Sequence, residues 1–314
     1  MSKDNKIIVI LGQTSTGKSD FAVEIAKNIK GEIISADSRQ VYKGMNLGTG
    51  KITKKEMQEI PHYLLDVASP SKVFTVNDFK KIADKEIKEI FKKNKTPILC
   101  GGTGFYIDTV VNGTVFPDVK PDHILRTKLE KKTKEKLFEM LEKLDPERSK
   151  NIDKNNKVRL IRAIEISKAL GKVPKLETLK NQDANADHQH KFDFNFNTLK
   201  IGLMIPDELL KEKINIRLLA RIKKGMLREM QNLHKSGLSW KRMEALGLEY
   251  RYGAMYLQGK INKDEMLEKI NTETWHYAKR QKTWFKRDIS TIWIDPRKNS
   301  DKNKALKKIK EFLK

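Results

Sequence analysis

Eight residues near the start of the chain have the types and the spacing of a phosphate-binding loop. Their pattern, G-x-x-x-x-G-K-[ST], is matched by Gly12, Gln13, Thr14, Ser15, Thr16, Gly17, Lys18 and Ser19. The glycines allow the backbone to curl so that several N–H groups converge on an anion, and the lysine adds a mobile positive charge. The serine hydroxyl is a candidate ligand for Mg²⁺. We therefore predict that this loop binds a di- or triphosphate together with Mg²⁺.

Asp37 lies at the end of a second apolar segment, GEIISADS over residues 31–38. In a parallel sheet this position shares an edge with the phosphate loop, because the carboxyl ends of the strands meet there. A carboxylate at that edge can hold Mg²⁺ through water, act as a general base, or cap the following turn. The position alone leaves these roles open.

The segments around these residues alternate between strand and helix patterns. The β-branched run at 7–11 predicts a buried parallel strand, and a helical spacing of apolar residues follows the phosphate loop. Residues 39–60 read as a long functional loop, and residues 76–93 as an amphipathic helix. A further buried strand is expected before the glycine turn at 101–104. Together these features predict an α/β fold with a P-loop NTPase-like, doubly wound parallel sheet.

From Pro121 onward the sequence changes to charged helical patterns, and a stretch rich in Asn, Asp and His at 181–197 predicts a loop or hinge. The other elements expected here are helices at 122–145, 155–170, 207–235, 241–258 and 263–288, strands at 199–205 and 291–294, and a basic amphipathic helix in the tail. We therefore predict an α/β core formed by residues 1–120 and 196–314. A helical insertion domain at 121–195 interrupts it.

The composition narrows the class of partner. The 314 residues include 65 Lys and Arg against 41 Asp and Glu, which gives a net charge of +24. Such a charge favours a polyanion such as nucleic acid, although a lysine surplus from AT-rich coding sequence explains it equally well. Cys100 is the single cysteine, so a disulfide within the chain is excluded. Because we find neither a membrane-spanning segment nor a signal peptide, we expect a cytoplasmic protein with no membrane partner. We also expect a monomer.

A phosphate-binding loop by itself leaves several classes of enzyme open. A GTPase would add an N-K-x-D motif, but the sequence NKTP at 94–97 lacks the aspartate. A small-molecule kinase on the same core remains an alternative, because it combines such a loop with Mg²⁺, a carboxylate and a lid arginine. A nucleic-acid-binding NTPase, which would bind ATP without transfer chemistry, is the other alternative.

Beyond the loop, the sequence resembles the tRNA dimethylallyltransferase family, also called tRNA isopentenyltransferases, in its bacterial form. The most specific match is ISADSRQVYKGMNLGTGK at 34–51, with the pattern D-S-x-x-x-Y-x-G-M-x-x-G-T. Further matches follow in family order: PHYLLDV at 61–67, GGTGFY at 101–106, RLIRAIE at 159–165, residues 217–226, LGLEYR at 246–251 and KRQKTWF at 279–285. Gln13 departs from the family, which commonly has proline there, and LEYR at 248–251 varies on the usual I-G-Y-R.

The resemblance implies transfer of a dimethylallyl group from dimethylallyl diphosphate to N6 of the adenosine next to the anticodon. The phosphate loop would then hold the diphosphate leaving group, with Arg221 reaching the same phosphates and Arg217 as a weaker candidate. Asp37 would accept the N6 proton, and Thr103 would place a hydroxyl near the reacting amine. These assignments make Asp37, Thr103 and Arg221 the catalytic candidates.

The resemblance also implies contacts with the anticodon stem-loop of tRNA. Its target base must be flipped out of the stack to reach such a site. The adenine pocket would be lined by Asp37, Ser38, Arg39 and Gln40. The insertion would hold the tRNA through Arg126, Arg159, Leu160, Ile161 and Arg162.

Overall fold

The computed structural model describes residues 5–174 and 196–314. The predicted hinge at 181–197 therefore lies outside the described residues except for its last two positions. Two compact units divide the chain: residues 1–113 with 190–314 form one, and residues 114–189 form the other. The first unit corresponds to the predicted α/β core and the second to the predicted insertion.

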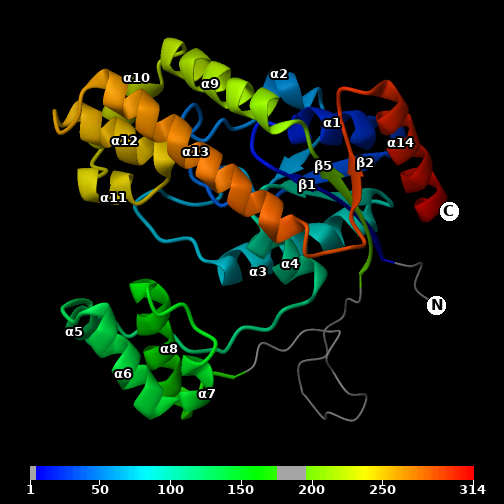
Figure 1. Cartoon of the computed structure of the whole chain (residues 1–314). Coiled ribbons are helices and arrows are strands. Elements are labelled where there is room, and N and C mark those ends of the chain that lie inside the picture. The colour runs from blue at the N-terminus through cyan, green and yellow to red at the C-terminus, as the bar shows by residue number, and fades with distance from the viewer. Residues whose placement is uncertain (1–4, 175–195) are drawn as a thin grey trace, which may run out of the picture. The chain divides into compact units, whose positions relative to one another are not determined.

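A six-stranded, all-parallel sheet forms the centre of the first unit, which confirms the α/β prediction (Figure 1). The strands, in the spatial order β3-β2-β4-β1-β5-β6, are His62–Tyr63, Gly31–Ser35, Thr96–Gly101, Lys6–Gly12, Asn197–Leu203 and Ile292–Ile294. The two-residue strand β3 was not predicted, because so short a segment has no periodicity to detect. The loops that follow β1, β2 and β4 share one edge, because β4 lies between the other two.

Helices cover both faces of this sheet. On one face, Phe21 and Ile25 of α1 (Lys18–Ile29) pack with Ile309 of α14 (Asn299–Leu313) against Ile8 and Ile10 of β1. On the opposite face, α3 (Val76–Lys92) and α4 (Gly104–Val111) pack against the alternate residues of β1. The central strand is therefore apolar on both sides, as a buried parallel strand must be.

A third group of helices packs around its own core beside residues 41–45. These are α9 (Asp207–Lys223), α10 (Met226–Lys235), α11 (Trp240–Glu244), α12 (Leu248–Leu257) and α13 (Lys263–Phe285). The single helix predicted at 207–235 is broken at Gly225, where φ is +100°, and the one predicted at 241–258 is broken at Gly247, where φ is +148°. Another correction concerns the loop predicted at 39–60, which contains the short helix α2 (Lys54–Met57).

The second unit contains only helices among its described residues. They are α5 (His123–Glu130), α6 (Lys134–Leu144), α7 (Pro146–Ser149) and α8 (Lys157–Leu170). The helix predicted at 122–145 is interrupted because the Thr133 side chain accepts a hydrogen bond from the Lys136 N–H and starts a new helix. In neither unit does a described helix combine the length and apolarity required to cross a bilayer.

Candidate functional site

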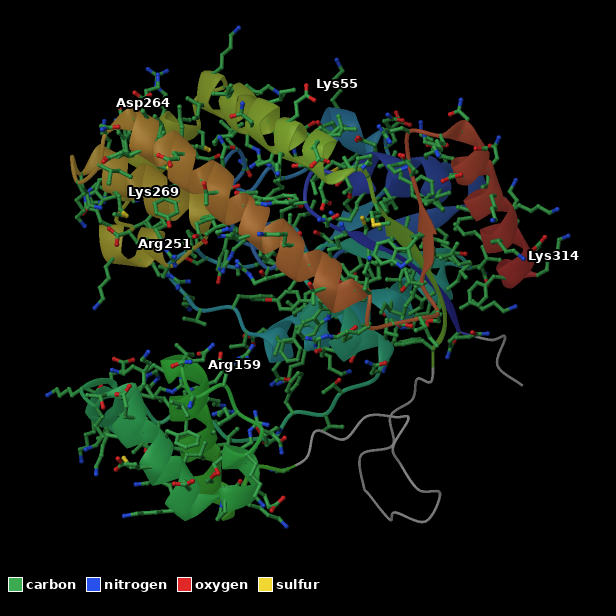
Figure 2. All side chains as sticks on the ribbon, in the orientation of Figure 1. Lys55, Arg159, Arg251, Asp264, Lys269 and Lys314 are labelled. Atoms are coloured by element: carbon green, nitrogen blue, oxygen red, sulfur yellow. The ribbon has the colours of Figure 1, made fainter. Side chains whose placement is uncertain are left out.

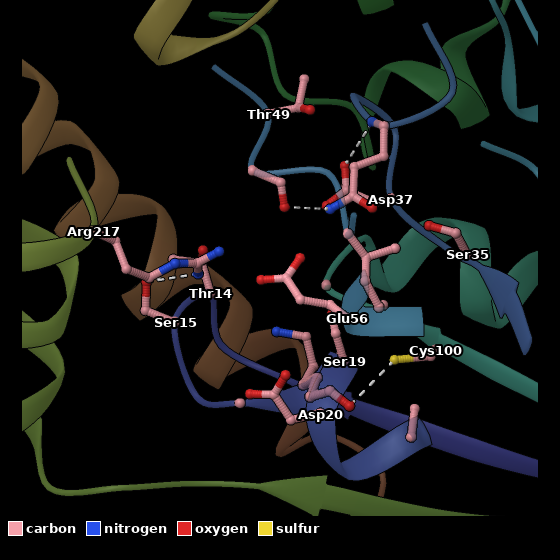
Figure 3. Close-up of a pocket in the computed structure, with 18 of the residues that line it drawn as sticks. Thr14, Ser15, Ser19, Asp20, Ser35, Asp37, Thr49, Glu56, Cys100 and Arg217 are labelled. Atoms are coloured by element: carbon pink, nitrogen blue, oxygen red, sulfur yellow. Dashed lines mark hydrogen bonds between the residues drawn. The ribbon is translucent and has the colours of Figure 1, made fainter. Parts of the chain in front are cut away.

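The carboxyl edge of the sheet and the third group of helices enclose a pocket of about 420 Å³. Its lining includes five residues of the phosphate loop (Thr14, Ser15, Gly17, Lys18 and Ser19), Asp37, Gln40 and two arginines of α9, Arg217 and Arg221. In Figure 3, Ser15 and Arg217 lie together on one side of the pocket and Asp37 lies on the other. The structure therefore brings five of the eight predicted phosphate-loop residues and the predicted base into one cavity, whereas Ser38, Arg39 and Thr103 are not among the residues that line it.

The backbone of the phosphate loop is tightly curled. Ser15 has a φ of +62° and Gly17 a φ of +87°, so the backbone turns tightly just before α1 begins. The Lys18 Nζ reaches back over the loop and donates to the Gln13 carbonyl at 2.5 Å, and the Thr16 hydroxyl donates to the same oxygen at 2.8 Å. Removal from water lowers the pKa of Lys18 to about 8, so the ammonium is retained at neutral pH.

Helix α13 holds the phosphate loop from behind, which sequence reasoning missed. The buried Gln281 accepts a hydrogen bond from the Thr14 N–H at 2.8 Å and donates to the Gly102 carbonyl at 2.7 Å. The Gln13 side chain, at the position of the expected proline, donates to the Ala278 carbonyl at 3.1 Å. These contacts tie the phosphate loop, the turn after β4 and α13 into one frame.

Asp37 combines a structural contact with a free acceptor. Its Oδ1 accepts from the Arg39 N–H at 2.8 Å and from the Gln40 N–H at 3.3 Å, so the carboxylate does cap the turn. Its Oδ2 has no hydrogen-bond donor among the described residues, and the side chain is half-buried in the pocket wall. Asp37 can therefore hold the turn and still accept a hydrogen bond from a ligand.

Thr103 lies beside this turn. Its Oγ1 accepts from the Ser38 N–H at 3.1 Å and also contacts the Ser38 hydroxyl at 3.4 Å. The Tyr277 hydroxyl of α13 hydrogen-bonds to Thr103 as well, and burial, with the nearby Asp37 charge, raises the pKa of Tyr277 to about 12. Tyr277 therefore stays protonated at neutral pH. It is a further member of the site that the sequence did not reveal.

The two arginines of α9 lie one helical turn apart on the same wall of the pocket. Arg217 donates to the Ser15 hydroxyl at 3.1 Å, so it contacts the phosphate loop directly. Arg221 forms an ion pair of 3.0 Å with Glu249 of α12. This contact with the loop supports Arg217 as a phosphate-binding candidate beside Arg221.

The predicted residues of the insertion separate into two groups. Leu160 and Ile161 are 0% and 7% exposed in the core of this unit, so their side chains are not available for contact with a nucleic acid. Arg159 is exposed at the start of α8 and is labelled in Figure 2. Of these three residues, only Arg159 has a side chain that is exposed to solvent and available for contact with a nucleic acid.

Arg126 and Arg162 both pair with Glu165, whose side chain is 2% exposed. Arg126 donates to it through Nε and Nη2, at 2.9 and 2.8 Å, and Arg162 also donates to the Val119 carbonyl at 2.9 Å. Burial opposes ionisation of Glu165, but the hydrogen bonds from the two arginines hold its pKa below the ordinary value. The two ion pairs therefore stabilise the insertion, and each of the two arginine side chains remains about one-third exposed.

The donor set around Ser19 fits a hard divalent cation. Ser19 is exposed at the start of α1, and the carboxylates of Asp20 and Glu56 line the same pocket. Mg²⁺ prefers such oxygen ligands and commonly keeps several waters and substrate phosphates in its shell. Within the described residues no group of three or more His, Cys, Asp or Glu side chains could hold a metal by itself. This site thus suits a cation that arrives with a phosphate ligand.

The fold and the pocket define a class of protein: a parallel α/β protein whose pocket is lined by a glycine loop between β1 and α1 and by a carboxylate that follows β2. Residues 40–288 match the model of the IPP transferase family, and the chain belongs to that family. The resemblance seen in the sequence is thereby confirmed.

Similar proteins cover almost the whole chain. The tRNA dimethylallyltransferase 2 of Treponema denticola is 41% identical over 91% of this chain and 93% of its own length. The tRNA dimethylallyltransferase of Acetivibrio thermocellus is 37% identical over 98% of this chain and 97% of its own. Among solved structures, the tRNA isopentenylpyrophosphate transferase of Bacillus halodurans superposes with a TM-score of 0.73 at 31% identity, covering 99% of this chain and 97% of that one.

Proposed function

We propose that the protein transfers a dimethylallyl group from dimethylallyl diphosphate to N6 of the adenosine next to the anticodon in tRNA, releasing diphosphate. One observation carries the proposal: a single pocket is lined by Lys18 and its loop neighbours, by Arg217 and Arg221, and by Asp37 and Gln40, with Ser15 and Arg217 on one side and Asp37 on the other (Figure 3). That arrangement separates a site for a polyanionic leaving group from a site for a neutral nucleophile. The family match and relatives named tRNA dimethylallyltransferase support this choice of substrates.

The chemistry follows from these two sides. As the C–O bond of the allylic diphosphate breaks, negative charge grows on the diphosphate, and Lys18, the two arginines and the loop N–H groups stabilise it. The N6 lone pair of adenine is delocalised into the ring, so the amine is a weak nucleophile. Asp37 Oδ2 can accept an N6 hydrogen bond and then its proton as the new C–N bond forms.

Mg²⁺ is part of the proposal, with Ser19 as its protein ligand. When bound, the cation would neutralise part of the diphosphate charge. Asp20 and Glu56 line the same pocket, and their carboxylates would accept hydrogen bonds from water bound to the cation. We further propose that the enzyme is cytoplasmic, since its substrate is tRNA, and that it acts as a monomer.

The test is transfer of label from dimethylallyl diphosphate to tRNA in the presence of Mg²⁺, with ATP hydrolysis measured in parallel. We expect labelled N6-dimethylallyladenosine in the digested tRNA and no tRNA-dependent ATP turnover. Phosphorylation of a small acceptor by ATP would instead support a kinase. Binding of tRNA with ATP turnover and no label transfer would support a nucleic-acid-dependent NTPase.

The pH dependence of diphosphate binding should report on Lys18. Its pKa of about 8 in the free protein means that the ammonium loses its proton as the pH rises through about 8. Because a bound anion favours the charged form, affinity should be greatest below pH 8 and fall above it, by up to about tenfold per pH unit. Calorimetry with inorganic diphosphate between pH 7 and 9 measures this.

Inorganic diphosphate itself titrates in the same pH range, so Lys18→Ala serves as the reference. The difference between the affinity–pH profiles of the wild type and Lys18→Ala gives the contribution of the lysine. Parallel profiles for the wild type and Lys18→Ala would show that Lys18 does not supply the titrating charge.

Arg159 is predicted to contact a tRNA phosphate. Arg159→Ala should lower the slope of log affinity against log salt concentration by about one, because one phosphate contact and its released counterions are lost. Affinity for inorganic diphosphate should stay unchanged. Filter binding of tRNA across a salt series checks this.

Lys168, on the last turn of the same helix, offers a matched control that also removes one exposed positive charge. If Lys168→Ala changes the slope as much as Arg159→Ala does, the effect is one of net charge and the specific contact is absent.

A further inference from the structure

Glu229 of α10 has four hydrogen-bond partners that the catalytic scheme does not use. Its Oε2 accepts from the backbone N–H groups of Asn46 and Leu47, at 2.9 and 2.8 Å. Its Oε1 accepts from the Gly48 N–H at 3.1 Å and from the Tyr250 hydroxyl at 2.6 Å. A single carboxylate therefore occupies a nest of three consecutive N–H groups, a concavity that suits an anion.

The segment held in this way, residues 46–50, forms part of the pocket wall. Thr49 and Gly50 line the pocket, and Thr49 closes the turn by donating to the Met45 carbonyl at 2.7 Å. We call residues 46–50 the wall loop. Its only described side-chain anchor on α10 is Glu229, which is half-buried.

The wall loop packs closely against Tyr250 of α12. Its ring is 1% exposed, and a Cβ added to Gly48 would lie 2.5 Å from two of its ring carbons. Burial and the adjacent Glu229 charge raise the pKa of the Tyr250 hydroxyl, which therefore remains a donor. The wall loop is thus fixed against both α10 and α12.

The far end of the wall loop meets the arginines of the diphosphate side. A Cβ at Gly50 would lie 2.1 Å from Arg221 Nη2 and 3.1 Å from Arg217 Nη2, so both guanidinium groups rest against the bare backbone of this residue. The Gly50 carbonyl also accepts from Gln40 Nε2 at 3.4 Å. The backbone of Gly50 therefore contacts both the two arginines and Gln40 of the Asp37–Gln40 turn.

We infer that Glu229 is a positioning residue for the diphosphate site: through the wall loop it fixes the surface against which Arg221 lies. The carboxylate is about the right size and charge for the nest, and no other described side chain holds Asn46, Leu47 and Gly48 together. Without it, the three N–H groups of the wall loop lose their acceptor, and the backbone against which Arg221 lies is held less tightly. This inference rests on the proposed function, because it assumes that Arg221 binds diphosphate.

The test is a double-mutant cycle with inorganic diphosphate as the probe and calorimetric affinity at constant Mg²⁺ as the readout. Glu229→Gln keeps the size of the side chain but turns one oxygen into an NH₂ donor, which removes the charge and the acceptor of at least one of the three wall-loop N–H groups. We expect Arg221→Ala to weaken binding by about ten- to a hundredfold, the range for losing a charge-assisted hydrogen bond. Glu229→Gln alone should weaken it by about fivefold or more.

The cycle separates positioning from general loss of structure. If Glu229 acts through Arg221, the double variant should bind no more weakly than Arg221→Ala alone, whereas independent effects would add. Glu244→Gln is the matched control, because this carboxylate also accepts two side-chain hydrogen bonds within the same group of helices, from Gln258 and Lys260, away from the wall loop.

Three outcomes overturn the inference: additive losses, an equal loss in Glu244→Gln, or a Glu229→Gln protein that melts earlier yet binds diphosphate normally below its Tm. A wild-type protein that does not bind diphosphate would instead overturn the proposed function.

Discussion

Asp37→Asn is expected to lower the single-turnover rate of transfer to tRNA by about 10²–10⁴, the usual effect of removing a general base. The amide keeps the shape of the side chain, and its oxygen can still accept from the Arg39 and Gln40 N–H groups that hold the turn. The group facing the pocket is then an NH₂, which cannot take a proton. Folding and the affinity for both substrates should therefore be retained.

A magnesium titration separates two roles for this carboxylate. If Asp37 mainly organises the cation, raising Mg²⁺ should restore the rate of Asp37→Asn, whereas a missing base is not restored in this way. Thr103→Val is a useful comparison, because it removes the neighbouring hydroxyl without touching the carboxylate. Transfer by Asp37→Asn at close to the wild-type rate would refute the base assignment.

Lys18→Ala should raise the barrier to transfer by several kcal/mol, within the range for losing one electrostatic stabiliser of a developing negative charge. The ammonium already lies over the phosphate loop, on the Gln13 carbonyl, so its charge needs little movement to reach the diphosphate. The variant also loses that hydrogen bond, and its melting temperature must be checked alongside kcat/KM.

Lys18→Arg is the companion variant, since it keeps the charge and changes the shape. We expect it to recover part of the lost rate. A tenfold or smaller fall in kcat/KM for Lys18→Ala would exclude the role assigned to this lysine.

The sequence predicted those parts of the site that depend on local order along the chain. Strand, glycine loop and helix are contiguous around Lys18, and Asp37 directly follows the next strand, so the rule that strand ends share an edge was enough to join them. The breaks at Gly225 and Gly247 were also visible, although we placed continuous helices across them. Glycine in a helical pattern is a weak stop signal unless its φ is known.

The parts that were missed depend on contacts distant in sequence. Gln281 and Tyr277 reach the site from α13, and no spacing rule relates them to Thr14 or Thr103. The burial of Leu160 could have been predicted from the sequence, because Leu160, Ile161 and Ile164 have helical spacing and form one packed face. The Arg162–Glu165 pair was also detectable from its i, i+3 spacing, but the bond from Arg126 to Glu165 required the fold.

The register of β1 has a consequence for synthesis on the ribosome. On one side β1 pairs with β4, but its other partner is β5, where Ile8 lies opposite Leu199. At translation rates of about 5–20 residues per second, β5 is synthesised on the order of 10–40 s after β1, and this edge of β1 stays unpaired until then. An unpaired strand edge invites pairing with other chains. The nascent protein is therefore most vulnerable to aggregation while the insertion is being made, and a chaperone that shields β1 during that interval would raise the yield of folded enzyme.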